Sequence, residues 1–202
     1  MSVAAAVLAA GGGTRFEGPT HKLLAPLRDK PVVQWAIESA LAAGFDTVYV
    51  AHGAVDLSEV VPGGVTLVEV PDWHDGQARS LAAVVARAEA DRHDAIVVGL
   101  GDQPLVGPAA WRTVGAGRGQ IVTASFDGDR RPPVKLEAAV WPLLDGVGDE
   151  GARGLMRSRP DLVREVRCIG NPFDIDRLED LATWSSPTPS PSTGLSPRPG
   201  GF

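Results

Sequence analysis

The sequence is poor in cysteine, in positive charge and in long apolar runs, and each shortage excludes a class of protein. Cys168 is the only cysteine among the 202 residues. No disulfide can therefore form within the chain, and a cysteine-based metal site is not expected. The histidines are also too far apart for the short ligand spacings of zinc sites; they are His21, His52, His74 and His93.

Positive charge is outweighed by negative charge, with 19 basic and 25 acidic residues and a formal net charge of −6. Nucleic acids and anionic membranes select basic surfaces, so we expect neither as the main partner. A small anionic ligand can be bound by a few cationic side chains in one place, so the negative net charge does not exclude such a ligand.

No stretch approaches the roughly 20 apolar residues of a membrane span. The N-terminal run VAAAVLAAGGG is similar to the core of a signal peptide. However, no lysine or arginine precedes it, and its apolar part is only about eight residues long. We therefore expect a cytoplasmic protein without a membrane partner.

What the sequence does contain is a regular alternation of apolar runs and helical patterns. The helical pattern at 31–44 starts with Pro31 and stops at Gly44, and a second covers 76–90. Short apolar runs typical of strands lie at 3–8, 46–51, 65–70, 94–100, 120–125, 132–137 and 162–169. Strands separated by helices predict an α/β fold with a mostly parallel, doubly wound sheet.

The composition changes abruptly near the end of the sequence. Residues 185–202, SSPTPSPSTGLSPRPGGF, consist mainly of proline, serine and glycine. We expect one folded domain over residues 1–184 and a disordered tail over 185–202. The tail is interpreted as a solvated segment, and a docking or phosphorylation segment is the alternative.

The segment LAAGGGTRFEGPTHKLL, residues 8–24, follows the first predicted strand. Its glycine triplet allows positive φ angles and brings backbone amides close to an anion. Arg15 offers a planar fork for phosphate oxygens, and Lys22 offers a point charge. The segment is therefore interpreted as a cradle for a polyphosphate, with a tight turn and two solvated cations as the alternative.

Two common nucleotide motifs do not fit this segment. In a P-loop the second glycine precedes Lys-Ser or Lys-Thr, but Gly18 precedes Pro19 and Thr20. A dinucleotide fingerprint needs glycine or alanine at position 16, which is Phe16. The glycine loop belongs to neither class.

Aspartates supply the candidate metal ligands. Asp102 follows the strand 94–100, and ligands bind beyond the carboxyl ends of such strands, so Asp102 should meet the glycine loop there. A carboxylate at that place suits Mg²⁺. Asp174 and Asp176 are two residues apart, so their side chains point to the same side if the segment is extended. This arrangement permits a joint metal site with Asp102. The alternatives are helix caps, with Asp102 capping a segment that begins near Pro108 and Asp176 capping the last predicted helix.

Taken together, these segments resemble the MobA-like nucleotidyltransferases, and most closely the molybdenum cofactor cytidylyltransferases. L-A-A-G-G-G-T-R-F with K-L-L at 22–24 is similar to the signature loop of that family, and G-D-Q-P at 101–104 to its metal-binding motif. The remaining similar segments are W-H-D-G-Q-A-R-S-L at 73–81, G-D-E-G-A-R at 148–153 and D-I-D-R-L-E-D-L at 174–181. The resemblance covers residues 3 to about 182 in the expected order.

The resemblance implies a single three-layer, Rossmann-like nucleotidyltransferase domain and a Mg²⁺-dependent transfer of a nucleotide to an acceptor phosphate. It assigns catalysis to Arg15, Lys22 and Asp102, and metal binding to Asp102 and Asp174. It assigns nucleotide binding to Leu8, Ala9, Ala10, Gly11, Gly12, Gly13, Arg15, Lys22, Gly76, Ser80 and Asp102. Gln77 is a weaker candidate.

The favoured donor is CTP, because Ala10 is typical of the cytidylyl branch, and GTP is the alternative. The implied acceptor is molybdopterin-bound molybdenum, with a molybdoenzyme as a further partner. A sugar or polyol phosphate is the alternative acceptor. A nucleotide-binding chaperone without turnover is the alternative function.

Two departures from the family bear on these expectations. Residues 130–134 read Arg-Arg-Pro-Pro-Val where relatives commonly have Gly-His-Pro-Val. Arg177 and Leu178 replace the usual Thr-Pro. The first departure concerns the choice of acceptor, and the second concerns a local turn.

Overall fold

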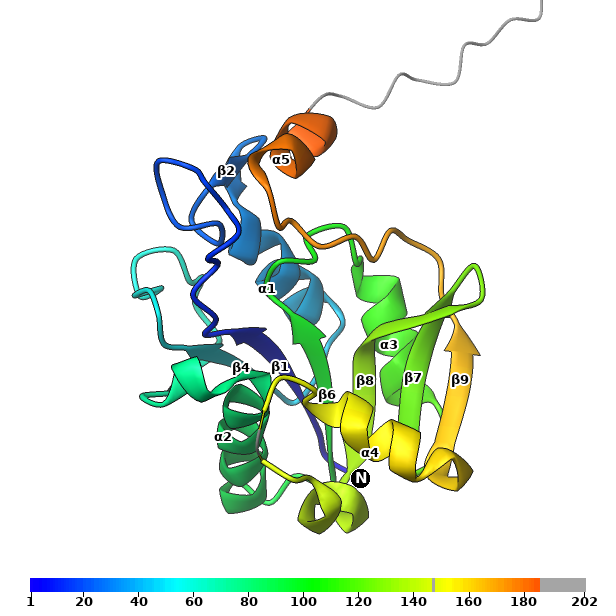
Figure 1. The fold of residues 1–202 in the computed structure, drawn as a ribbon. Helices are drawn as coiled ribbons and strands as arrows, with labels where there is room; N and C mark the ends of the chain where they lie inside the picture. Colours follow the sequence, from blue (N-terminus) through cyan, green and yellow to red (C-terminus); the bar gives the residue numbers. More distant parts are fainter. Residues whose placement is uncertain (147, 186–202) are drawn as a thin grey trace, which may run out of the picture.

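A computed structural model describes residues 1–146 and 148–185, and these form one three-layer α/β domain (Figure 1). The sheet order is β5-β4-β1-β6-β8-β7-β9. Its strands are β1 (Val3–Ala9), β4 (Thr47–His52), β5 (Thr66–Glu69), β6 (Ala95–Leu100), β7 (Ile121–Phe126), β8 (Asp129–Glu137) and β9 (Val163–Arg167). The predicted α/β class and mostly parallel sheet are confirmed. The tail was predicted over 185–202; Ser185 is the last residue of the final helix, and residues 186–202 lie outside the described residues.

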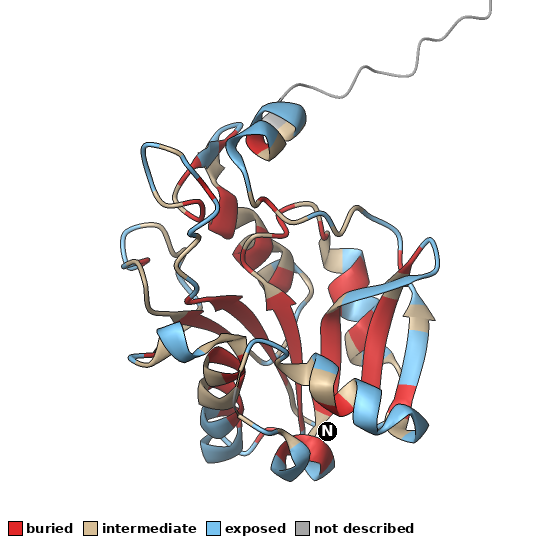
Figure 2. Ribbon diagram, in the orientation of Figure 1, coloured by how far each residue is buried: buried red, intermediate tan, exposed pale blue. Residues whose placement is uncertain are grey.

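The central strands β1 and β6 are buried on both faces because they alternate side chains between two helical layers, whereas the edge strand β9 is largely exposed (Figure 2). In β1, Ala4, Ala6 and Leu8 face the helices α2 (Gln77–Ala90) and α4 (Ala152–Ser158). The other β1 residues, Ala5, Val7 and Ala9, face α1 (Val32–Ala42) and α3 (Pro108–Ala116). Continuous apolar strands of this kind are typical of parallel sheets covered by helices.

One strand of the sheet runs against the others. β8 pairs antiparallel with both β6 and β7, whereas the other sheet pairings are parallel. Asp127 and Gly128 form the two-residue turn between β7 and β8, with φ of 49° and 96°. Two positive φ angles are characteristic of the type I′ hairpin turn, for which Asp-Gly is a strong sequence signal. The direction of β8 was therefore encoded locally, although the alternating strand and helix pattern did not reveal it.

Smaller elements complete the domain. The helix α5 (Leu178–Ser185) forms where the last helix was predicted, whereas α4 was not predicted because its seven residues are too few to show a clear period. A two-stranded hairpin, β2 (Pro26–Leu27) and β3 (Lys30–Pro31), follows the glycine loop. The single-turn helices are η1 (Trp73–Asp75), η2 (Ala138–Leu143) and η3 (Pro160–Leu162). Across the described residues, none of the helices has the length and apolar character needed to cross a membrane.

Candidate functional site

A pocket of about 580 Å³ opens where β1 and β6 end. It lies between the glycine loop, the start of α2, and the loops that carry Asp102 and Asp176. Every residue assigned to nucleotide binding from the sequence lines this pocket: Leu8, Ala9, Ala10, Gly11, Gly12, Gly13, Arg15, Lys22, Gly76, Ser80 and Asp102. The expected convergence of the glycine loop with the Asp102 loop is therefore present in the fold.

The glycine loop is fixed by neighbouring side chains. Gly13 has φ of +60°, and its carbonyl accepts a hydrogen bond from the Phe16 amide at 2.9 Å. His21 Nε2 lies 3.1 Å from the Gly11 carbonyl oxygen. A Cβ on Gly12 would lie 2.9 Å from the Trp73 ring, so the loop backbone packs directly on that indole. The loop is thus held open toward the pocket.

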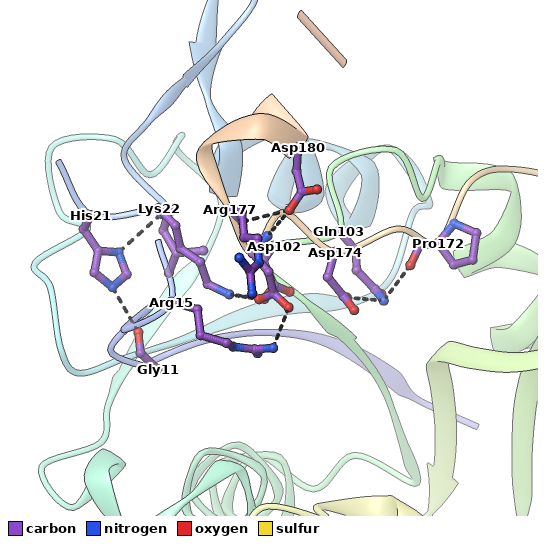
Figure 3. A network of polar contacts seen from close by, with 12 residues as sticks. Gly11, Arg15, His21, Lys22, Asp102, Gln103, Pro172, Asp174, Arg177 and Asp180 are labelled. Carbon is purple, nitrogen blue, oxygen red and sulfur yellow. Dashed lines mark hydrogen bonds and ion pairs between the residues drawn. The ribbon is translucent and has the colours of Figure 1, made fainter. Parts of the chain in front are cut away.

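Two cations and two carboxylates form a network on the wall of the pocket (Figure 3). Lys22 Nζ lies 2.6 Å from Asp102 Oδ2 and 3.1 Å from Asp176 Oδ1, and Arg15 Nη1 lies 3.0 Å from Asp176 Oδ2. Only 11% of the Lys22 side chain is exposed, against 71% for Arg15. Burial lowers the pKa of Lys22, but the two aspartates outweigh burial and leave this pKa raised. Lys22 is therefore a permanent cation between two chain segments.

Asp174 lies behind this network, on the wall of a neighbouring cavity of about 700 Å³. Its Oδ1 accepts a hydrogen bond from Gln103 Nε2 at 2.8 Å (Figure 3). Burial, and then the negative charge of Asp102, raise the pKa of Asp174. Asp102 and Asp174 are thus close enough to repel each other.

The carboxylates differ in their free oxygens. Both oxygens of Asp176 are engaged, one by Lys22 and one by Arg15. Within the described part of the chain, Asp102 Oδ1 and Asp174 Oδ2 have no hydrogen-bond partner. In the same residues, no three acidic, histidine or cysteine side chains come together as a complete ligand set. Mg²⁺ is ordinarily held by one or two carboxylates plus substrate phosphates. Asp102 and Asp174 each offer one free oxygen for such an ion, and they line two different cavities.

The capping alternatives for the aspartates are wrong. Gly107, not Asp102, stands at the start of α3. At the start of α5, Asp180 Oδ2 accepts hydrogen bonds from the amides of Asp176 at 3.0 Å and Arg177 at 2.8 Å. The Asp176 carboxylate is therefore left to face the two cations.

Several residues of the pocket were not assigned to it from the sequence. They are Thr14, Leu23, Trp73, His74, Leu100, Asp149 and Asp176, with Gln77 as the weaker candidate noted above. Trp73 and Asp149 lie within segments that resemble family motifs, which was the signal available for them. Asp176 was considered in sequence for a joint site with Asp102 or as a helix cap, and its contacts with Lys22 and Arg15 place it at the pocket.

The backbone at Gly76 joins the start of α2 to the segment before α4. Gly76 has φ of +112°, and an added Cβ would lie 2.5 Å from the carbonyl oxygen of Gly148. We expect Gly76→Ala to destabilise the fold by about 2–4 kcal/mol, because an unfavourable φ and a backbone overlap add together. Urea unfolding measures this change. Gly63→Ala is the matched control, since a Cβ there meets nothing within 4 Å; equal stability of the two variants would contradict the prediction.

The comparisons with known proteins identify a family. The family model of the MobA-like NTP transferase domain matches residues 5–164. The nicotine blue oxidoreductase of Paenarthrobacter nicotinovorans is 30% identical over 195 residues, covering 89% of this chain and 94% of that protein. The 3-deoxy-manno-octulosonate cytidylyltransferase of Vibrio cholerae is 35% identical over 116 residues, covering 56% of this chain but only 44% of that enzyme.

Solved structures of similar fold cover almost the whole domain. The crystal structure of Rv0371c from Mycobacterium tuberculosis H37Rv has a TM-score of 0.80 and 31% identity, covering 91% of this chain and 97% of that chain. A structure of that protein in complex with manganese has a TM-score of 0.76 and 30% identity, covering 91% and 98%. Because the family model spans most of the domain, the chain belongs to the MobA-like NTP transferase family and is a nucleotidyltransferase.

Proposed function

We propose that this chain transfers CMP from CTP to a phosphorylated acceptor, with Mg²⁺ as cofactor, and releases pyrophosphate. The acceptor that we favour is molybdopterin-bound molybdenum. The observation that carries the proposal is the position of Lys22. Its ammonium group lies in the wall of the pocket that the glycine loop lines, and it also contacts Asp102.

The chain's own residues account for binding of the triphosphate. Amides of the glycine loop and the cations Arg15 and Lys22 hold the β- and γ-phosphates. Gly76 and Ser80, at the start of α2, face the base or the ribose. Lys22 and Arg15 exchange their carboxylate partners for phosphate oxygens when the nucleotide binds. The same cations then stabilise the negative charge that develops on the leaving pyrophosphate.

Asp102 and Asp174 are the residues that would hold the magnesium ion, each through the oxygen without a hydrogen bond. When bound, the ion neutralises charge on the α-phosphate and on the leaving pyrophosphate. A related structure contains manganese, which supports a divalent cation in this family.

The reaction needs no side-chain nucleophile. An acceptor phosphate is already ionised near neutral pH, so its oxygen attacks the α-phosphorus directly. One P–O bond forms, the bond between the α-phosphorus and the bridging oxygen breaks, and pyrophosphate carries away the electron pair. The chain contributes positioning and charge neutralisation, which are the main components of phosphoryl-transfer catalysis.

CTP is favoured by Ala10 in the signature loop and by the local likeness to a cytidylyltransferase. We expect pyrophosphate release with CTP, Mg²⁺ and the molybdenum cofactor, measured by a coupled phosphate assay beside ATP, GTP and UTP. Faster release with GTP would contradict the choice of donor. Tight CTP binding without release, across the pterin and a panel of sugar phosphates, would support the chaperone alternative. Because one relative is named as an oxidoreductase, NADH consumption is followed in parallel and should stay at background.

A further inference from the structure

A second cavity, of about 330 Å³, lies on the α2 and α4 face of the sheet and adjoins the nucleotide pocket. Leu8, Gln77 and Leu100 line both spaces, so they form the border between them. The two helices that flank the cavity stand on the same side of β6 and β8 (Figure 1). A ligand in this cavity would lie beside a nucleotide in the first pocket.

The floor of this cavity is almost entirely apolar. Its side chains are Leu8, Leu81, Val98, Leu100, Val134 and Met156. Thr123 is the polar exception on the floor, 1% exposed, and its hydroxyl has only a long contact of 3.4 Å to the Ala124 carbonyl oxygen. An apolar floor of this kind favours binding of a flat ring system, because apolar surface of the ring is removed from water. It disfavours binding of a sugar, because the hydroxyl groups of the sugar would find no hydrogen-bond partners on the floor.

The rim of the cavity is strongly basic. It carries four arginines, at 130, 131, 153 and 157, against the single carboxylate of Glu150. Arg157 pairs with Glu150, and Arg130 pairs with Glu165. Among the described residues, the side chains of Arg131 and Arg153 form no direct hydrogen bond or ion pair, and each acts at longer range on one carboxylate, Arg131 on Asp174 and Arg153 on Glu150. Two guanidinium groups without a direct ion-pair partner at the rim of one cavity suit an anionic ligand.

We propose that Arg131 and Arg153 form an anion subsite above this apolar floor, and that the cavity takes a flat, largely apolar ring compound with an anionic group. Polyhydroxylated sugar phosphates are poor ligands for it. The proposal rests on the proposed function only in identifying this ligand with the acceptor. Arg131 belongs to the segment 130–134 in which the sequence departs from the pattern common in the family.

The test measures binding alone, without nucleotide or metal, so that it can succeed or fail independently of catalysis. The probe is 1-naphthyl phosphate, titrated by calorimetry beside glucose 1-phosphate. We expect 1-naphthyl phosphate to bind about tenfold or more tightly than glucose 1-phosphate. Arg131→Gln/Arg153→Gln should weaken the naphthyl probe about tenfold, because two charge-assisted contacts are lost. Arg118→Gln is the matched control, since Arg118 is exposed and lines neither cavity.

The chain contains a natural reporter of where the probe binds. Met156 is one of only two methionines, and it lies on the cavity floor. In protein labelled with ¹³C-methyl methionine, the probe should shift the Met156 signal and leave Met1 unchanged, and saturating CTP should not displace it. The proposal is overturned if the Met156 signal does not move, if CTP displaces the probe, if glucose 1-phosphate binds equally well, or if Arg118→Gln weakens binding as much as the double variant.

Discussion

Asp102→Asn is expected to lower the rate of pyrophosphate release from CTP by about 10³-fold, since the loss of a charged group at a phosphoryl-transfer centre has effects of this order. The side chain keeps its shape, but it loses the charge that pairs with Lys22 at 2.6 Å and that would hold the cation. Binding of Mn²⁺, followed by electron paramagnetic resonance, should weaken in parallel. Steady-state kinetics with CTP gives the rate.

The control for this variant is Asp29→Asn, at an exposed aspartate outside the pocket. It should retain the wild-type rate and the wild-type Mn²⁺ affinity. Asp174→Asn should also weaken Mn²⁺ binding, because Asp174 supplies the second free carboxylate oxygen. If Asp102→Asn released pyrophosphate at the wild-type rate, the assignment of Asp102 to the metal and to catalysis would be wrong.

Lys22→Met is expected to lower kcat/KM for CTP by about 10²–10³-fold, because the buried ammonium group that faces the phosphates is lost. The variant leaves Asp102 and Asp176 without the cation that lies between them. Removing that cation should not weaken Mn²⁺ binding. Unchanged Mn²⁺ affinity would therefore distinguish Lys22→Met from Asp102→Asn. Kinetics and Mn²⁺ titration on the same preparations measure both properties.

Lys30→Met is the matched control for the lysine substitution. Lys30 pairs with Glu38 at 2.5 Å, outside the nucleotide pocket. A similar loss of kcat/KM in both lysine variants would mean that the effect comes from general destabilisation. Loss of Mn²⁺ binding in Lys22→Met would contradict the division of roles between cation and carboxylate.

Local sequence patterns were sufficient for most of the fold. The continuous apolar run of β1 and the Gly44 stop after α1 are signals carried by neighbouring residues, and both elements lie where they were expected. β8 shows where the reasoning from alternation failed. The Asp127-Gly128 turn carries the hairpin signal, and the alternation of strands and helices alone does not show it.

The sequence predicted which residues line the site, but not which of their side chains form ion pairs with one another. The glycine loop and Asp102 could be placed together because the carboxyl ends of neighbouring parallel strands meet at one edge of a sheet. The engagement of Asp176 by Lys22, across 154 residues of sequence, could not be read from spacing. The resemblance assigned only Asp174 to the metal, and the structure shows that different partners surround Asp174 and Asp176.

The sequence by itself determined the chemistry that is available: glycine amides, two ordered cations and strand-end carboxylates, with almost no cysteine. These properties follow from residue type and local order, which need no knowledge of distant contacts. The tertiary structure decided which carboxylate keeps a free oxygen, which arginines lack a direct ion pair and where an apolar cavity adjoins the nucleotide pocket. Charge pairing and enclosure depend on distances in space between segments far apart in the chain, and only folding sets those distances.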